Sequence, residues 1–316
     1  MVVRVLTEGV VRVVKVMRVV KIVRLVRVVM GISGRTADVV CSGVKFGRIH
    51  HVAVPVGSLK DAVQFYSRVL GMSNVTEVDG GCVPEACVRV GEQTIHLLET
   101  ASPDPIQGRP HHAGRDRHVA ISVHDLAPLK ASLESNGVLY TLSQSGRDAI
   151  FCRDTYGNGW EFAPAETFRY TTRQFAQFLT PVKPEVGLKM AWGGMPHVGI
   201  LGSDVQLAKK FYCGVLGMVD ETDLRPSKLP FPGLFLRCGE QQVHFMQLLN
   251  PDVRTVSARP SHGMDRRTAY SIDDLAPLRI ALKSAGIPYR ESEWRGTPVV
   301  YCRDPDTNEL MFMQIS

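Results

Sequence analysis

The sequence contains no closely spaced cysteine pair and no long apolar run. Its seven cysteines include no Cys-x-x-Cys motif, and their number is odd. This pattern argues against a disulfide scaffold, gives no support to a zinc–thiolate site, and is typical of a reducing compartment. No apolar run approaches the ~20 residues that a membrane-spanning helix needs, so we expect no membrane partner.

Beyond its first 47 residues, the chain also lacks an excess of either charge. Residues 1–47 hold six Arg and three Lys against Glu8 and Asp38, a balance of +7. The formal net charge of the whole chain is +6, so the remainder carries −1. The chain after residue 47 is nearly neutral and lacks the excess of positive charge by which proteins bind nucleic acid. We therefore expect no such partner.

The basic residues within 1–47 recur at an unusual period. From Arg12 to Arg27 every third position is basic, and apolar residues fill the gaps. A period of three matches neither a helix nor a strand. An Arg-rich, acid-poor leader resembles a transit peptide for a chloroplast or mitochondrion, although its Ser content is low. The other interpretation is a low-complexity tail or a misplaced start codon, which would make the protein cytoplasmic.

After the leader, the sequence repeats one unit four times. Each copy opens with a strand-like run, a polar turn and a helical pattern. The four copies start at His51, His118, His197 and Arg267. Self-similarity at a half-chain interval indicates two homologous domains. We place these domains at residues 48–163 and 195–316, with residues 164–194 as the link between them.

The local pattern of the first copy predicts a strand, a helix and about three strands. Ser58 is a suitable N-cap, apolar residues repeat at helical spacing up to Leu70, and Gly71 supplies a stop. Strand-like runs follow at 86–90 and 93–98. Two such units make a domain, so the predicted fold class is α+β, with two tandem domains of two βαβββ modules each.

Four side chains of the first domain hold equivalent places in its two units. His51 and His118 begin first strands, and His96 and Glu161 lie on last strands. A local twofold relation would bring them towards one point. Three imidazoles and a carboxylate suit one divalent metal, Fe, Mn, Co, Ni or Zn, and His51, His118 and Glu161 alone would form a two-His-one-carboxylate triad. The simpler interpretation is that all four are structural or merely line a pocket.

The second domain has lost two of the four equivalent side chains. His197 and His244 are retained, but Arg267 and Met311 stand where the first domain has a histidine and a glutamate. Arginine cannot ligate a metal at any accessible pH, and a thioether is a soft donor in place of a hard carboxylate. We therefore expect this half to be metal-free and structural, or to bind an anion through Arg267.

Several motifs together resemble those of the vicinal oxygen chelate superfamily, the glyoxalase/bleomycin-resistance/extradiol-dioxygenase group. They are Ile49-His-His-Val-Ala53, Phe65-Tyr66 with Leu70-Gly71, Gly91-Glu-Gln-Thr-Ile-His96, Arg117-His-Val-Ala-Ile-Ser122, and Arg153-Asp-Thr-Tyr-Gly-Asn158 with Glu161. The resemblance implies modules whose mixed sheet curls into an open cup around a metal. It also implies a substrate that chelates through neighbouring oxygens, and a ligand carboxylate, here Glu161, that moves a proton.

The sequence departs from the pattern of glyoxalase I within this group. That pattern has an arginine four residues beyond the first-strand ligand, where this chain has Pro55 and Leu201. It also has a glutamate where this chain has His96. These departures argue against lactoylglutathione lyase activity itself and leave related lyases and isomerases open.

The resemblance leaves two ways of pairing the modules. If each domain closes its own cup, the metal ligands are His51, His96, His118 and Glu161. If the modules exchange between domains, as in fused glyoxalases, the ligands are His197, His244, His118 and Glu161. In the exchanged arrangement His51 and His96 face Arg267 and Met311.

The leading hypothesis is a metal-dependent, glyoxalase-like lyase or isomerase in which Glu161 moves the proton. One alternative is ring-cleaving dioxygenation on Fe(II), with His112 or Tyr156 as the acid/base. The other is a metal-free binding protein of the bleomycin-resistance kind. In each case the expected partner is a small molecule, and the chain is a monomer with pseudo-dimeric domains or a homo-oligomer.

If residues 1–47 are a transit peptide, their fusion to a fluorescent reporter should enter a chloroplast or mitochondrion, because basic, acid-poor leaders direct import. Microscopy of the fusion beside the reporter alone measures this. A diffuse cytosolic signal from the fusion would end the targeting hypothesis.

Overall fold

The computed structural model describes residues 3–7, 10–14, 43–76, 85–168, 190–252 and 265–315. The chain divides into two compact units, Met1–Asp38 and Val39–Ser316. In the first unit, β1 (Val3–Thr7) and β2 (Val10–Val14) pair as an antiparallel hairpin. Most of the leader predicted at 1–47, and most of the link predicted at 164–194, lie outside the described residues.

The second unit contains the four predicted modules, which we number in chain order. Module 1 consists of β3 (Phe46–Val56), α1 (Leu59–Gln64), β4 (Glu85–Val90) and β5 (Gln93–Glu99). Module 2 consists of β6 (His118–Val123), α2 (Leu126–Ser135), β7 (Tyr140–Leu142), β8 (Ile150–Arg153) and β9 (Gly159–Pro164).

The second domain repeats this plan. Module 3 consists of β10 (His197–Gly202), α4 (Val205–Lys209), β11 (Val219–Asp220), β12 (Gly233–Cys238) and β13 (Gln241–Gln247). Module 4 consists of β14 (Arg267–Ile272), α5 (Leu275–Ser284), β15 (Tyr289–Trp294), β16 (Thr297–Arg303) and β17 (Glu309–Gln314). The predicted α+β class and the strand–helix–strands order are confirmed.

Side-chain caps start the helices of all four modules. The Ser58 hydroxyl accepts a hydrogen bond from the Asp61 N–H at 3.3 Å, and an aspartate caps α2, α4 and α5 in the same way. α1 and α4 continue as π-helical turns over Phe65–Val69 and Lys210–Val215. Gly71 ends the first of these with φ +64°, a left-handed conformation that suits glycine. Within the described ranges, no helix is both long and apolar enough to span a bilayer.

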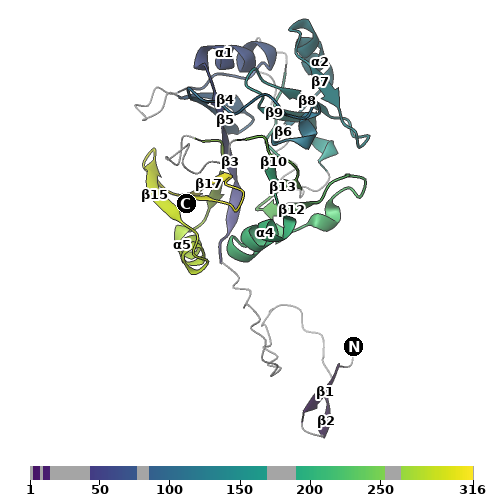
Figure 1. Ribbon diagram of the computed structural model, residues 1–316, viewed down its shortest axis with the longest axis vertical. Coiled ribbons are helices and arrows are strands. Elements are labelled where there is room, and N and C mark those ends of the chain that lie inside the picture. The colour runs from purple at the N-terminus through teal and green to yellow at the C-terminus, as the bar shows by residue number, and fades with distance from the viewer. Residues whose placement is uncertain are drawn as a thin grey trace. The chain divides into compact units, whose positions relative to one another are not determined.

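The modules pair across the two domains. One sheet has eight strands in the order β11-β12-β13-β10-β6-β9-β8-β7, and the other has seven in the order β15-β16-β17-β14-β3-β5-β4. The eight-stranded sheet therefore joins modules 2 and 3, and the seven-stranded sheet joins modules 1 and 4 (Figure 1). At each centre two first strands pair antiparallel, β6 with β10 and β14 with β3. The modules of one domain thus lie in different sheets, and no cup closes within a single domain.

Buried tyrosines tie together the two modules of each domain. The Tyr66 hydroxyl of module 1 donates to Asp154 Oδ2 of the loop after β8 in module 2, at 2.8 Å. Tyr212 and Asp304 repeat this contact at 2.8 Å between modules 3 and 4. Both tyrosines are fully buried, so each hydrogen bond satisfies a carboxylate that water does not reach. Sheet pairing and these hydrogen bonds together link the four modules into a closed ring.

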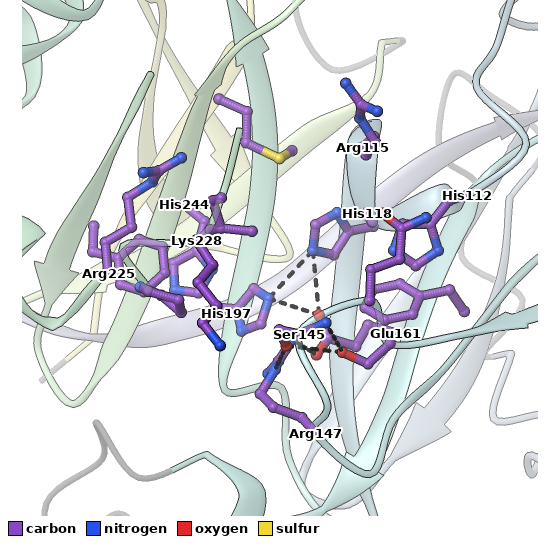
Figure 2. Close-up of a pocket in the computed structure, with 18 of the residues that line it drawn as sticks. His112, Arg115, His118, Ser145, Arg147, Glu161, His197, Arg225, Lys228 and His244 are labelled. Atoms are coloured by element: carbon purple, nitrogen blue, oxygen red, sulfur yellow. Dashed lines mark hydrogen bonds and ion pairs between the residues drawn. The ribbon is translucent and has the colours of Figure 1, made fainter. Parts of the chain in front are cut away.

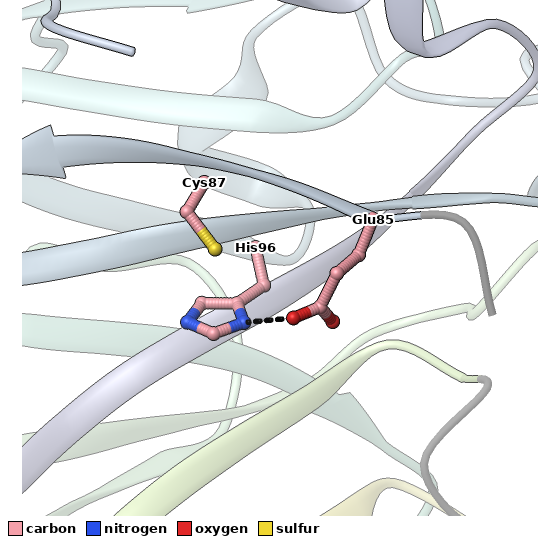
Figure 3. Close-up of side chains that lie close together, drawn as sticks. All are labelled: Glu85, Cys87 and His96. Carbon is pink, nitrogen blue, oxygen red and sulfur yellow. Dashed lines mark ion pairs between the residues drawn. The ribbon is translucent and has the colours of Figure 1, made fainter. Parts of the chain in front are cut away.

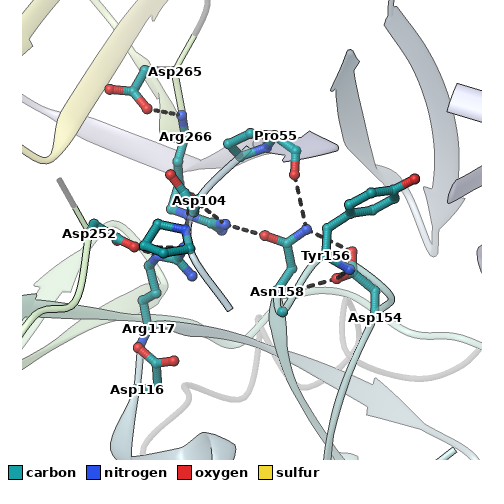
Figure 4. Close-up of polar contacts among 12 residues, drawn as sticks. Pro55, Asp104, Asp116, Arg117, Asp154, Tyr156, Asn158, Asp252, Asp265 and Arg266 are labelled. Atoms are coloured by element: carbon teal, nitrogen blue, oxygen red, sulfur yellow. Dashed lines mark hydrogen bonds and ion pairs between the residues drawn. The ribbon is translucent and has the colours of Figure 1, made fainter. Parts of the chain in front are cut away.

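A buried network of arginines and aspartates joins loops of both domains (Figure 4). Arg117 pairs with Asp104 and with Asp252, each at 2.6 Å, and Arg266 pairs with Asp104 at 3.1 Å. Asp104 precedes β6 in the first domain, whereas Asp252 follows β13 in the second. Breaking a buried pair would leave an uncompensated charge, so the network favours one relative position of these loops. Because Arg117 directly precedes His118, the network positions the start of β6.

We expect Tyr66→Phe to lower the free energy of unfolding by about 1–3 kcal/mol, because Asp154 would lose a buried hydrogen-bond donor. Urea unfolding followed by tryptophan fluorescence measures the change. Tyr140→Phe is the matched control, because its hydroxyl bonds to Glu134 at the exposed surface and its loss should leave the free energy of unfolding almost unchanged. Equal losses in the two variants would contradict the proposed importance of the Tyr66 contact.

Candidate metal centre

Strand pairing places His118, Glu161 and His197 on one face of the eight-stranded sheet. Gly199 lies opposite His118 in the β6–β10 pair, and Glu161 lies opposite Ala120 in the β6–β9 pair. Alternate residues of a strand point to the same side, and strand partners share a side. His197, two residues before Gly199, therefore faces the same way as His118 and Glu161. Figure 2 shows these side chains converging.

The close approach of His118 to β10 requires the glycine opposite it. A Cβ atom at position 199 would lie 2.5 Å from Cε1 and 2.7 Å from Nδ1 of His118. A larger residue would therefore displace the imidazole from its place beside His197. In the seven-stranded sheet the equivalent residue, opposite Arg267, is Ala53. The sequence analysis did not single out Gly199, because a strand glycine carries no local signal of what lies across from it.

Three ligand atoms form a nearly equilateral triangle. His118 Nε2 lies 3.3 Å from His197 Nε2, and Glu161 Oε2 lies 3.4 Å from the first and 3.2 Å from the second. The centre of such a triangle is about 1.9 Å from each atom, close to the ~2.0–2.2 Å at which imidazole nitrogens and carboxylate oxygens bind a first-row ion. The three side chains could therefore hold a metal ion.

A backbone contact sets the tautomer of His118. Its Nδ1 atom lies 2.8 Å from the carbonyl oxygen of Asp116. A carbonyl oxygen only accepts, so Nδ1 carries the proton and Nε2 presents its lone pair to the triangle. The Asp116 side chain is itself held by Arg109 at 3.1 Å and Arg153 at 2.8 Å. These contacts orient the imidazole as a ligand.

The charge states of the site also suit metal binding. Burial alone would raise the pKa of Glu161, but His197, His118 and Arg147 hold that pKa well below its usual value. Arg147 Nη2 lies 2.9 Å from Glu161 Oε1. Burial lowers the pKa of His197 to about 4 even though Glu161 opposes the shift. Near neutral pH the site thus combines an anionic carboxylate with a neutral imidazole, the forms that ligate metals. Sequence analysis missed Arg147, which lies in a loop without any motif.

His244 lies beside this triangle and is not one of its corners. Its ring stacks between Phe235, at 3.6 Å between centroids, and His197, at 3.8 Å. Its Nε2 atom lies 2.9 Å from Gln242 Oε1. The group of ligand atoms that could hold an ion therefore contains His118, Glu161 and His197 but not His244.

The triangle opens into a pocket of about 820 Å³ between modules 2 and 3. Apolar side chains of module 3, including Phe231, Phe235 and Met246, form part of its wall. Basic side chains are prominent around it (Figure 2). They are Arg115, Arg147, Arg225 and Lys228. A pocket of this size, with a few polar groups converging on one wall, is suited to a small molecule.

His51 and His96 lie in the seven-stranded sheet and are not brought to His118 and Glu161. The reason is strand pairing, because β3 pairs with β14 and not with β6. The rings of His51 and His96 stack at 4.2 Å between centroids, and Trp294 stacks on His51 at 5.2 Å. The four-residue set predicted for a cup closed within the first domain is therefore not assembled.

The structure also shows where the remaining predicted residues lie. Arg267 and Met311 are buried in the seven-stranded sheet, and Ala269 of β14 lies between His51 and Met311 in the register. His112 lines the pocket of the eight-stranded sheet, with Nδ1 2.7 Å from Thr141 Oγ1. The ring of Tyr156 lies over Gly57 instead, where an added Cβ would meet its Cε1 at 2.9 Å.

The chain belongs to the Glyoxalase/Bleomycin resistance protein/Dioxygenase superfamily, which it matches over residues 48–162 and 194–312. This finding confirms the resemblance drawn from the motifs, and each match covers one of the two homologous domains. A comparison with curated proteins found no match.

Solved structures share the fold across both domains. A putative dioxygenase from Bacillus subtilis subsp. subtilis str. 168 has a TM-score of 0.61 and 14% sequence identity, with 85% of each chain covered. Glyoxalase I from Zea mays has a TM-score of 0.57 and 17% identity, covering 86% of this chain and 94% of the maize chain. Likeness at these identities establishes the fold and not the reaction.

We expect His197→Ala to weaken Mn²⁺ binding by at least about 100-fold, because residues that only support metal ligands already contribute 10- to 100-fold. Mn²⁺ suits this test since it prefers oxygen and nitrogen donors. Calorimetric titration of the metal-free chain measures the affinity. His51→Ala is the control and should bind like the unaltered chain, because His51 lies in the other sheet. Equal losses in the two variants would contradict the placement of the site.

Proposed function

We propose that the protein is a divalent-metal-dependent lyase or isomerase of glyoxalase type, acting on a small substrate that chelates the metal through neighbouring oxygens. The triangle of ligand atoms from His118, Glu161 and His197, at the wall of an open pocket, is the observation that carries this proposal. Membership of the superfamily supports the same class. When bound, the ion would polarise a substrate carbonyl and stabilise an enolate or oxyanion.

The donor set fits a first-row divalent ion such as Fe, Mn, Co, Ni or Zn. Two imidazoles and a carboxylate would supply three donors, and all three residues line the pocket. Protein ligands of this number leave positions for two substrate oxygens. The exchange of modules between domains, which the family resemblance associates with fused glyoxalases, favours the lyase or isomerase reaction.

In this proposal Glu161 both binds the metal and transfers a proton between neighbouring substrate carbons. Its Oε1 atom is engaged by Arg147, whereas Oε2 faces the two histidines. Oε2 is therefore the atom that we assign both to metal binding and, when it is not a ligand, to proton transfer. His197, His118 and Arg147 keep the carboxylate anionic, which is the form that accepts a proton. General acid–base catalysis of this kind contributes typically about 10²–10⁴-fold.

The basic side chains around the pocket favour a substrate that carries an anionic group. Arg115, Arg225 and Lys228 line the same pocket as the ligand triangle. Arg225 is held by the Phe231 carbonyl and lies over the Phe231 ring at 5.2 Å, so its position is restrained before substrate binds. Charge-assisted hydrogen bonds from such groups are about twice as strong as neutral ones. They offer an anion site different from the glyoxalase I arginine that Pro55 and Leu201 replace.

A second candidate function is Fe(II)-dependent dioxygenation. Two histidines and one carboxylate on one side of an ion form the triad typical of non-haem Fe(II) oxygenases. His112 lines the same pocket, and burial together with nearby His118 lowers its pKa. A neutral imidazole there could act as the acid/base that ring cleavage requires.

A turnover panel of hemithioacetals and catechols, run with each candidate metal, tests these functions. We expect isomerisation of a hemithioacetal-type substrate, and a fall in kcat of at least about 100-fold in Glu161→Gln, because the proton carrier is lost. His118→Ala should lose metal and activity together, and His51→Ala should keep both.

The other outcomes discriminate between the alternatives. Oxygen consumption with a catechol, without isomerisation, would favour the dioxygenase. A purified chain that takes up no metal at His118, Glu161 and His197, yet binds small molecules, would overturn both enzymatic proposals and favour a sequestering protein.

A further inference from the structure

The hairpin of β4 and β5 carries a second group of metal-binding side chains, in the seven-stranded sheet. Cys87 lies opposite His96 in the register, and Glu85 is two residues before Cys87, so all three share one face. Their ligand atoms all lie within 4.8 Å of one another. Figure 3 shows the carboxylate and the thiol flanking the imidazole.

The equivalent hairpin of the other sheet lacks two of these three donors. In β12 and β13, Phe235 lies opposite His244, and Gly233 is two residues before Phe235. Cys87 and Glu85 thus stand where module 3 has a phenylalanine and a glycine. The seven-stranded sheet has lost the donors equivalent to His118 and Glu161, and it has a thiol and a carboxylate on the hairpin instead.

The environment of His96 points to a ligand at this place. His96 is 1% exposed, and its Nδ1 atom has no hydrogen-bond partner. The other ring nitrogen, Nε2, lies 3.1 Å from Thr94 Oγ1, which fixes the ring. Nδ1 is directed at Glu85, with 3.6 Å to Oε1, a separation longer than a hydrogen bond. A buried ring nitrogen without a hydrogen bond is unusual, and coordination of a bound ion would account for it.

We propose that Glu85, Cys87 and His96 form a second metal site, selective for a thiophilic divalent cation such as Zn²⁺ or Co²⁺. One thiolate, one imidazole and one carboxylate are donors that Zn²⁺ accepts, and water would complete four-coordination. Neighbouring donors around such an ion stand about 3.3–3.6 Å apart, so shifts of about 1 Å would close the group around it. The Glu85 side chain is 26% exposed, which gives the ion a route from solvent.

The charges around the group are compatible with a cation. Arg267 and Arg295 act on His96 with positive charge, and Glu85 faces it with negative charge at 3.6 Å. The two arginines oppose a second cation nearby. The Glu85 carboxylate and a Cys87 thiolate supply two negative charges against them, and the thiol proton is released to solvent when the metal binds. A hard ion with no affinity for sulfur would therefore bind more weakly at this site.

Titration of the metal-free, reduced chain with Co²⁺ tests the proposal, because a thiolate bound to Co²⁺ gives a near-ultraviolet charge-transfer band that oxygen and nitrogen ligands do not give. We expect the band to appear in the unaltered chain and to persist in His118→Ala, where the other centre is disabled and the band should saturate at one equivalent per chain. Cys87→Ser should abolish it. Cys213→Ser is the matched control, because Cys213 lies on the π-helical turn of module 3, and it should keep the band.

Glu85→Gln is a second variant at a partly exposed position, and circular dichroism checks that it is folded. It should keep the band but need at least tenfold more Co²⁺ to reach half-saturation. Absence of the band in the unaltered chain, or its survival in Cys87→Ser, would overturn the proposal. An unchanged half-saturation in folded Glu85→Gln would also overturn it, since the carboxylate would then not be a ligand.

Discussion

The candidate metal centre depends on the antiparallel pairing of β6 with β10. This contact places His118 of the first domain beside His197 of the second, and β9 adds Glu161 from the other side of β6. Neither domain contains the three ligands by itself, so the centre forms only when both are folded against each other. The pairing also joins two module edges into one continuous sheet, which removes open strand edges that would otherwise invite association. Assembly of the fold and assembly of the site are therefore the same event.

The surrounding structure restrains the side chains of the candidate metal centre. The Asp116 carbonyl orients His118, buried arginines hold the Asp116 carboxylate, and Arg147 holds Glu161. Each contact restrains a side chain that would otherwise lose conformational freedom on binding, which is the usual condition for a precise metal or catalytic site. The hydrogen bonds from Tyr66 and its counterpart in the second domain extend this support to the helices, because they connect modules that do not share a sheet.

The two sheets share one backbone plan and differ in their chemistry at a few equivalent positions. Where the eight-stranded sheet has a histidine opposite Gly199, the seven-stranded sheet has Arg267 opposite Ala53. Where the first has Phe235 stacked on a histidine, the second has Cys87 beside one. The predicted loss of one site rested on these equivalent positions alone and stays a prediction. It could not anticipate donors on the neighbouring strand, because their proximity to His96 follows from hairpin register and not from cysteine spacing.

The sequence alone determined the modules, because caps, helical spacing and strand alternation act over a few residues and were readable at Ser58 and Gly71. It also singled out His118 and Glu161, which belong to the predicted ligand set in either pairing of the modules. Only the tertiary structure decided which histidine joins them. His51-Val52 lies within β3 and His197-Val198 begins β10, so local pattern does not distinguish His51 from His197 as the partner. That choice rests on strand pairing between residues far apart in the chain, and the same long-range contacts brought Arg147 and Gly199 to the site.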